Sequence, residues 1–219
     1  MKIERLHERG ESGELASLFA FSLTLPQKLA YEVDALCTFT GQGEDVRVIQ
    51  PSKEYWESKI TKNRFFLVPG YHNNEKTWRE LTLEALSKKP FEIKRLDGVY
   101  VDPHFTTTKD QAQWAVKKID ELAITSCGII SSPFHLVRAY TTALASMYKA
   151  DIRIPIIPIP IHVPPNGVIP ETGVSAWDML QGEMERITAY QKKGDVISYE
   201  KFREYIDWLW QQPIIKKSL

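Results

Sequence analysis

A short apolar run leads directly into a helix-forming segment at Gly128-Ile129-Ile130-Ser131-Ser132-Pro133-Phe134-His135-Leu136-Val137-Arg138-Ala139. This pattern predicts a strand that ends at two serines and turns at once into a helix. Ser132 suits the N-cap and Pro133 the first helical position, and the free N–H groups of that first turn form a favourable site for an anion. His135 and Arg138 stand three residues apart, so they share one face of the helix.

A second hydroxyl-rich segment also follows an apolar run and also opens a helical pattern. Its sequence is Asp102-Pro103-His104-Phe105-Thr106-Thr107-Thr108-Lys109-Asp110-Gln111-Ala112. Thr108 and Gln111 have the spacing of a capping box, so one or two of the threonines serve as caps. Three consecutive threonines exceed what a cap needs. For both segments the alternative is a capped helix whose polar side chains only face solvent.

Strand-like and helix-like segments alternate along the chain. The strands are expected at 33–39, 65–68, 93–101, 128–130 and 152–161, and the helices between them at 46–60, 75–88, 109–122 and 133–148. This alternation predicts an α/β fold with a doubly wound, mainly parallel sheet of about five strands. Pro51 falls inside the first helical segment, so a loop followed by a shorter helix remains an alternative there.

The chain changes character after residue 161. Six prolines lie on both sides of this point, at 155, 158, 160, 164, 165 and 170. They indicate that the last strand is an edge strand that leads into a stiff loop. Two helices follow, at 175–193 and 198–210, the first with an apolar stripe of Trp177, Leu180, Met184 and Ile187. We expect one domain over 1–219, with its core at 33–162 and a helical extension at 171–219. The helices' aromatic residues either pack on the sheet or dock a partner.

Composition narrows the class of protein. The 28 basic and 28 acidic residues leave no net charge, so nothing favours nucleic acid or an anionic membrane as partner. The charged N-terminus lacks a signal peptide and no apolar run is long enough to span a bilayer, so we expect a cytoplasmic protein without a membrane segment. Cys37 and Cys127 lie at apolar runs and suit packed, reduced thiols, and no metal-ligand spacing occurs among the histidines and cysteines.

Polar and glycine clusters follow most of the expected strands. In an open parallel sheet these exits share one edge, where ligands bind. The residues that we expect to bind a ligand there are Gly41, Gly43, Gly70, Thr106, Thr108, Ser131, Ser132 and Arg138. Backbone N–H groups, hydroxyls and one guanidinium suit a phosphate, a carboxylate or a nucleotide, although neither a dinucleotide fingerprint nor a phosphate loop is present.

These residues carry a resemblance to a known family. The end of one strand at Ser131 and Ser132, followed by Phe134, His135, Arg138 and Ala139, resembles the most specific motif of the YdcF/SanA/ElyC-like family, a bacterial domain of unknown function. The segment at 34–41, the turn at 67–70 and the helix start at Thr108, Asp110, Gln111 and Ala112 are also similar, with glutamine in place of the family's usual asparagine. The resemblance covers roughly 34–162. It implies a Rossmann-like fold and a nucleotide-like ligand such as S-adenosylmethionine.

Two classes of function compete. The first is an enzyme that holds a phosphate-bearing or nucleotide-like molecule, with Arg138 as the anion clamp, hydroxyls as donors and His135 as the candidate general acid or base. A histidine near a helix N-terminus tends to be neutral and can accept a proton. The second is a non-catalytic sensor or binding module that uses the same pocket. A phosphoester hydrolase is a third interpretation, which would need a metal or a covalent nucleophile.

Overall fold

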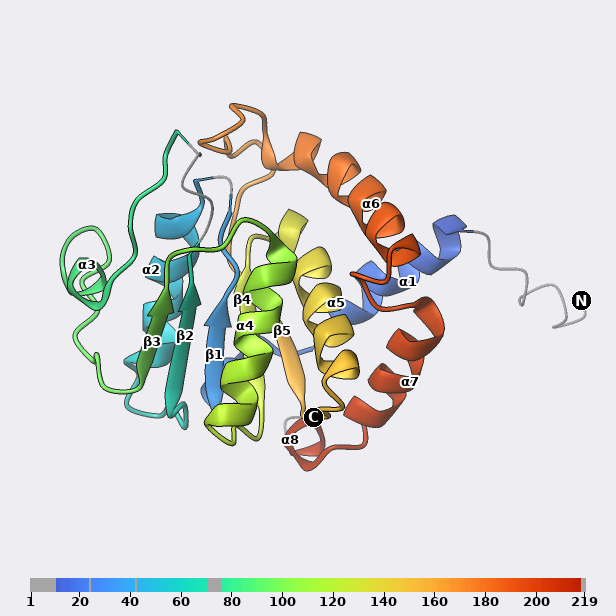
Figure 1. Ribbon diagram of the computed structural model, residues 1–219, viewed down its shortest axis with the longest axis horizontal. Helices are drawn as coiled ribbons and strands as arrows, with labels where there is room; N and C mark the ends of the chain where they lie inside the picture. The colour runs from blue at the N-terminus through green and yellow to red at the C-terminus, as the bar shows by residue number, and fades with distance from the viewer. Residues whose placement is uncertain (1–10, 24, 42, 71–75, 218–219) are drawn as a thin grey trace, which may run out of the picture.

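A five-stranded, fully parallel sheet forms the centre of the protein (Figure 1). The computed structural model describes residues 11–23, 25–41, 43–70 and 76–217. The strand order is β3-β2-β1-β4-β5. The strands are β1 (Ala35–Thr38), β2 (Phe65–Pro69), β3 (Val99–Asp102), β4 (Cys127–Ser131) and β5 (Ile156–Pro160). This is the Rossmann-like α/β fold that the alternation of segments predicts.

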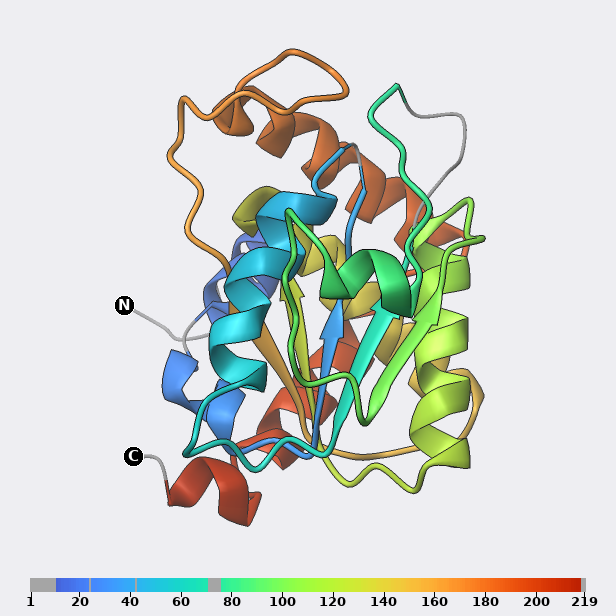
Figure 2. The ribbon, with the colours of Figure 1, turned by 90° about the vertical axis from the view of Figure 1, so that its left-hand side faces the viewer.

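Helices cover both faces of the sheet (Figure 2). The elements before β3 are α1 (Glu11–Ser22), the 3-10 helix η2 (Gln27–Tyr31), α2 (Asp45–Trp56) and α3 (Leu83–Ser87). Those after it are α4 (Thr108–Glu121), α5 (Pro133–Lys149), α6 (Ala176–Lys192), α7 (Tyr199–Leu209) and α8 (Pro213–Lys216). The helices α4 and α5 pack side by side on one face, and α2 covers the other. One hydrophobic core extends from α1 to α8.

The helix expected at 75–88 is wrong over most of its length. Only α3 is helical there, and residues 76–82 are irregular. The backbone N–H groups of Lys76 and Thr77 donate to the carboxylate of Glu171, so these groups bond to a distant segment and not within a helix. Thr82 then caps the short helix by accepting from the N–H of Ala85 at 3.0 Å. Residue 75 lies outside the described residues.

Two strands are shorter than the sequence predicts. The segment before β3 does not join the sheet because the N–H groups of Lys94 and Arg95 donate to the carboxylate of Glu57. The segment before β5 instead continues the end of α5, with the N–H of Ile152 bonded to the carbonyl of Met147. β5 is an edge strand, as predicted, and it tolerates Pro158 and Pro160 because only one of its sides pairs.

The helix expected at 46–60 forms, but it ends at Trp56. α2 is a continuous helix that contains Pro51, so the alternative of a loop does not hold. Cys37 and Cys127 are buried free thiols in β1 and β4, and burial raises the pKa of both. Among the described residues, no helix is long and apolar enough to cross a bilayer.

Candidate functional site

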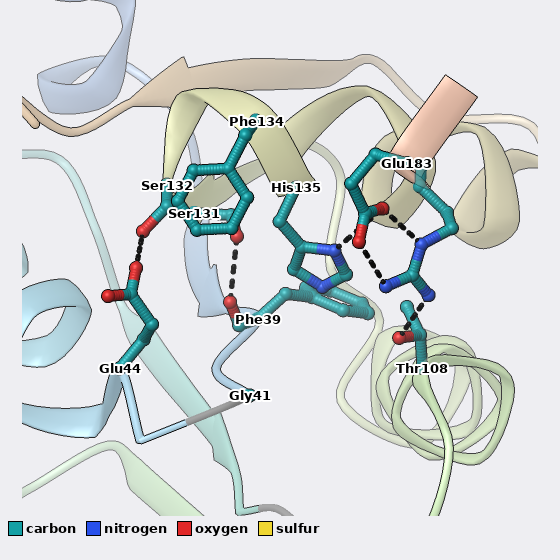
Figure 3. Close-up of a pocket in the computed structure, with 10 residues that line it drawn as sticks. Phe39, Gly41, Glu44, Thr108, Ser131, Ser132, Phe134, His135 and Glu183 are labelled. Carbon is teal, nitrogen blue, oxygen red and sulfur yellow. Dashed lines mark hydrogen bonds and ion pairs between the residues drawn. The ribbon is translucent and has the colours of Figure 1, made fainter. Parts of the chain in front are cut away.

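A pocket lies where the strand order reverses, between the carboxyl ends of β1 and β4 (Figure 3). Open α/β sheets bind their ligands at this point. We call it the switch-point pocket, and it is lined by Phe39, Gly41, Glu44, Thr108, Ser131, Ser132, Phe134, His135, Arg138 and Glu183. It encloses about 340 Å³, part of it open to solvent. The structure therefore brings Gly41, Thr108 and His135 to one place, although they are distant in sequence.

The two serines bind neighbouring elements. Pro133 occupies the first turn of α5 as predicted, and Ser132 is the N-cap residue, but its side chain makes no capping hydrogen bond. Its hydroxyl instead donates to the carboxylate of Glu44 at the start of α2. The hydroxyl of Ser131 donates to the carbonyl of Phe39 at 2.8 Å. Both serines line the pocket, and both also fasten β4 and α5 to the segment that follows β1.

The N-terminus of α2 is occupied by the protein's own carboxyl groups. Glu44 and Asp45 are both buried there. Burial raises the pKa of both groups, and in Glu44 the hydrogen bond from Ser132 and the charge of Arg47 oppose this effect. Arg47 lies 2.9 Å from Glu44. Because acidic side chains already stand at this helix end, it is a poor site for an anion.

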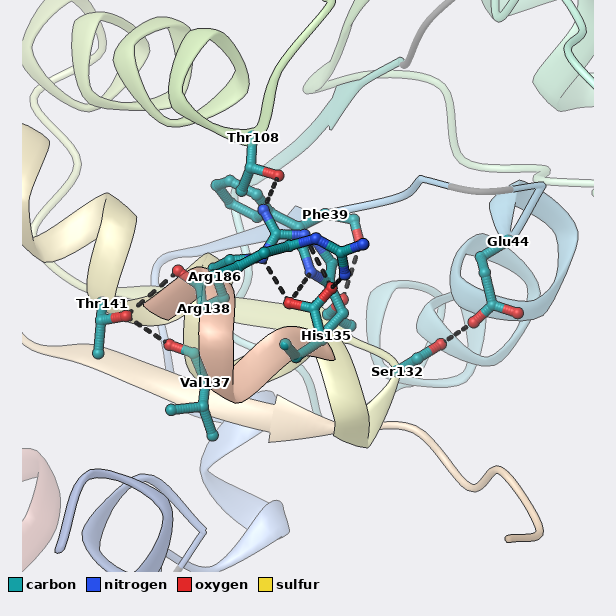
Figure 4. Close-up of polar contacts among 11 residues, drawn as sticks. Phe39, Glu44, Thr108, Ser132, His135, Val137, Arg138, Thr141 and Arg186 are labelled. Carbon is teal, nitrogen blue, oxygen red and sulfur yellow. Dashed lines mark hydrogen bonds and ion pairs between the residues drawn. The ribbon is translucent and has the colours of Figure 1, made fainter. Parts of the chain in front are cut away.

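Arg138 forms a buried ion pair with Glu183 of α6 (Figures 3 and 4). Its Nε and Nη2 donate to the two carboxylate oxygens, and Nη1 donates to Thr108 Oγ1 at 2.8 Å. Burial opposes ionisation of Glu183, but the hydrogen bonds and the charge of Arg138 hold the pKa of this carboxyl well below its ordinary value. Arg138 is therefore compensated by a carboxylate and joins α4, α5 and α6 in one network.

His135 lies beside this ion pair. Its side chain is 9% exposed, and its Nδ1 is 3.6 Å from Glu183 Oε2, too long for a hydrogen bond. Burial lowers the pKa of His135, as do the charges of Arg138 and Arg186, while Glu183 opposes them. The imidazole is therefore neutral at physiological pH. Figure 3 shows its ring between Glu183 and Phe39, at the wall of the pocket.

The threonines at 106–108 have different roles, since one caps α4 and another lines the switch-point pocket. Thr107, not Thr108, caps α4, because its hydroxyl accepts from the N–H of Asp110. Thr106 and Thr107 also donate to the Asp110 carboxylate. Thr108 is buried one residue further on and reaches Arg138. The capping box expected between Thr108 and Gln111 is thus displaced by one residue.

Gln111 has a structural role. Its Nε2 donates to the carbonyls of Thr40, Pro69 and Gly70, at 3.2, 3.3 and 2.7 Å. This single buried amide ties together the segments that leave β1 and β2. Gly70 lies against Pro103, where an added Cβ would come within 2.7 Å of the Pro103 Cα, so the close approach of two chains explains this glycine.

The glycines expected to bind the ligand separate into two groups. Gly41 lines the switch-point pocket. Gly43 has a φ of 75° and packs against Thr77 and Pro170, and neither it nor Gly70 lines this pocket. Thr106 lines a neighbouring cleft instead. Residues 71–74, which follow Gly70 in the exit from β2, lie outside the described residues.

Glu183 is the main site residue that the sequence analysis does not identify. The stripe expected on this helix is displaced by one position over its first three residues, where Ala176, Met179 and Glu183 are buried and Trp177 is 72% exposed. Ile187 is buried as predicted. The sequence signal for the burial of Glu183 is that it has the helical spacing of the apolar residues Ala176 and Ile187, which places it on the same face of the helix. Phe39, Glu44 and Phe134 complete the pocket and were also not identified.

Comparison with known proteins adds no further constraint. No protein-family model and no curated protein matches the chain. Within the described residues, no group of three or more histidine, cysteine or acidic side chains could hold a metal ion.

Proposed function

We propose that the protein binds a phosphate-bearing or nucleotide-like small molecule in the switch-point pocket. The observation that carries the proposal is the convergence of side chains from β1, β4, α4, α5 and α6 on one pocket at the reversal of strand order. Pockets at this position are the usual ligand sites of open parallel sheets. The pocket combines an apolar wall with a few polar groups, as small-molecule sites do.

The two parts of such a ligand would meet different surfaces. Phe39 and Phe134 form an apolar part of the pocket lining that a nucleobase or another ring can contact. The neutral His135 and the hydroxyl of Thr108 offer hydrogen-bonding groups beside them. Arg138 is paired with Glu183, so it would contact a ligand anion while it keeps this ion pair. It therefore offers the ligand a hydrogen-bond donor and not an uncompensated positive charge.

Binding can be tested with the purified full chain. Native mass spectrometry should detect a small molecule that co-purifies, and calorimetric titration with adenosine, ADP and S-adenosylmethionine should identify a binding class. We expect Phe134→Ala to weaken the bound probe and Trp177→Ala, at an exposed aromatic residue outside the pocket, to leave it unchanged. Absence of a co-purified molecule together with no binding of any probe would reject the proposal.

An enzyme is favoured over a sensor by one observation. His135 is neutral and lies at the wall of the pocket with its Nδ1 3.6 Å from a carboxylate, so its imidazole is in the form that can accept a proton. The alternative is a non-catalytic module that docks a partner through its C-terminal helices. The apolar face of α7 is less suited to this role because Phe202, Tyr205, Ile206 and Leu209 are buried within the protein.

We also propose that the chain belongs with the YdcF/SanA/ElyC-like proteins and acts in the cytoplasm. The motif that supports this kinship is the pair of serines followed by Phe134, His135 and Arg138, all of which line the pocket. Two buried thiols without a disulfide agree with a reducing compartment. S-adenosylmethionine is therefore one of the first probes to test.

A further inference from the structure

A second, wider opening adjoins the switch-point pocket. We call it the threonine cleft, and it is lined by Thr106, Thr107, Thr108, Lys109, Arg138, Thr142, Arg186, Tyr190 and Asp195. It encloses about 870 Å³, part of it open to solvent. Thr108 and Arg138 line both spaces, so the bond between them forms the wall that the two share (Figure 4).

The charges around the cleft favour an anion. Arg138 and Arg186 are balanced by Glu183, Lys109 lies 2.8 Å from Asp195, and Lys149 lies 4.0 Å from that same carboxylate. Asp110 stands in the first turn of α4. Three cations, Lys109, Arg138 and Arg186, line the cleft together with one carboxylate, Asp195, and the buried Glu183 balances the two arginines.

Arg186 is the cation best placed to bind a ligand from solvent. Its side chain is 41% exposed, and it contacts Glu183 through Nη1 alone at 3.0 Å. The remaining nitrogens of its guanidinium carry further N–H donors, which suit a phosphate. Figure 4 shows Arg186 of α6 beside Arg138 of α5.

Thr142 gives the second, independent indication of a ligand. Its side chain is 3% exposed, it lines the cleft, and its hydroxyl makes no hydrogen bond to any described residue. The hydroxyl of the neighbouring Thr141 donates to the carbonyl of Val137, one turn earlier in α5, at 2.7 Å. The hydroxyl of Thr142 makes no such bond to a carbonyl of its own helix. Because this residue lines the cleft and its hydroxyl has no partner among the described residues, the hydroxyl is available to a ligand there.

The start of α4 supplies further donors. The N–H groups of Thr108 and Lys109 lie in its first turn and have no acceptor among the described residues. The hydroxyls of Thr106 and Thr107 already donate to the Asp110 carboxylate, so toward a ligand they can only accept a hydrogen bond. The cleft thus offers Arg186 and Thr142 as its main donors, and the two N–H groups of α4 add less because Asp110 already stands in that first turn.

We infer that the threonine cleft is a phosphate subsite that takes the anionic part of a ligand whose ring occupies the switch-point pocket. The inference rests on the proposed function for the identity of that ligand. Thr108 and Arg138 line both spaces, so a molecule that contacts these two residues can have one part in the pocket and the other in the cleft. The same subsite would accept inorganic phosphate or diphosphate alone.

The test compares ligands with and without phosphate. Adenosine, ADP and inorganic diphosphate are titrated by calorimetry into the wild type, Arg186→Gln, Thr142→Val and the control Arg203→Gln, which changes an exposed arginine on α7. We expect Arg186→Gln to weaken ADP and diphosphate by about 10-fold or more, because a charge-assisted contact is lost. Thr142→Val should weaken them by about 3-fold to 10-fold. Adenosine should be unaffected in both, and Arg203→Gln should match the wild type.

The design separates this inference from the proposed function. Diphosphate that binds the wild type and is weakened by both cleft variants supports the subsite even if adenosine fails to bind. Thr142→Val removes an unpaired hydroxyl, so its melting temperature should not fall, and a weaker ligand at unchanged stability cannot be attributed to misfolding. The inference is overturned if diphosphate and ADP bind both cleft variants as they bind the wild type, or if neither binds the wild type.

Discussion

The guanidinium of Arg138 in α5 meets the carboxylate of Glu183 in α6 through two parallel contacts, one of them 3.0 Å long. Glu183 is 1% exposed and Arg138 is 10% exposed at their side chains. A bidentate pair at this depth aligns the two helices and fixes one wall of the switch-point pocket. Arg138, which the sequence predicts as the anion clamp of a ligand, is therefore already paired with an anionic group of the protein, the carboxylate of Glu183.

Removing one partner of this pair should destabilise the protein. Arg138→Met leaves a buried carboxylate without its main partner, and we expect a loss of about 3 kcal/mol in the free energy of unfolding. For a protein of this size the melting temperature should fall by about 6 to 12 °C. Arg203→Met, at an exposed site, is the control.

The double variant Arg138→Met with Glu183→Met should recover most of that loss, since two apolar side chains replace two desolvated charges. A double-mutant cycle from urea unfolding measures the coupling. If the single and double variants lose stability additively, the pair is not coupled and its structural role is rejected.

Stability should fall on mild acidification because of His135. Its pKa is lowered in the folded protein by burial and by Arg138 and Arg186, against the ordinary value of 6.5. The unfolded chain therefore takes up this proton first as the pH drops below about 6.5, and the folded state loses stability until its own lower pKa is reached. His135→Gln should lose less unfolding free energy than the wild type between pH 7.5 and 5.5. Equal losses in urea titrations would show that the histidine is not held neutral.

A second acid-sensitive group acts at lower pH. The pKa of Glu183 lies well below its ordinary value of 4.5, so its contribution is complete above that pH and disappears as the pH falls further. Glu183→Gln should therefore flatten the stability curve below pH 4.5 while it lowers stability at pH 7. Acid unfolding followed by circular dichroism checks this. A variant whose acid limb matches that of the wild type would contradict the assignment.

Catalysis, if it occurs, should depend on His135. We expect His135→Gln to leave the affinity for a substrate nearly intact and to lower turnover by about 100-fold or more, since positioned proton transfer supplies that much. His162→Gln, at an exposed histidine after β5, is the matched control. A parallel loss of affinity and turnover would make His135 a positioning residue, and no effect on either would make it a packing residue.

The turn after β1 should be sensitive to an added methyl group. Gly43 has a φ of 75°, and an added Cβ would overlap Thr77 Oγ1 and lie 3.1 Å from Pro170 Cβ. Gly173 has a φ of 73° with nothing within 4 Å, so Gly173→Ala measures the backbone cost alone, about 1 to 2 kcal/mol.

Gly43→Ala should cost about 1 kcal/mol more than Gly173→Ala, because Thr77 must move and weaken its 3.0 Å hydrogen bond to Glu171. Urea unfolding of both variants gives the difference. Identical costs would show that the contact between these loops does not constrain Gly43.

The architecture and the position of the site follow from local patterns in the chain. Apolar runs of strand length, separated by amphipathic segments, can bury their side chains only in a covered parallel sheet. Once the sheet is parallel, its exits share an edge, so Gly41, Thr108, Ser131 and His135 were predicted to meet, and they do. Pro133 at the first turn of α5 likewise follows from the missing N–H of proline.

The partners of these residues depend on contacts between distant segments. Residues 76–82 have helical spacing but stay irregular, because Glu171, far along the chain, binds their backbone. Thr107 displaces Thr108 as the cap, since the Thr108 hydroxyl is drawn to Arg138. Glu183 is the clearest case. A glutamate is normally placed on the solvent face of a helix, and here α6 turns it inward because Arg138 and Arg186 compensate a charge whose burial would otherwise be prohibitive.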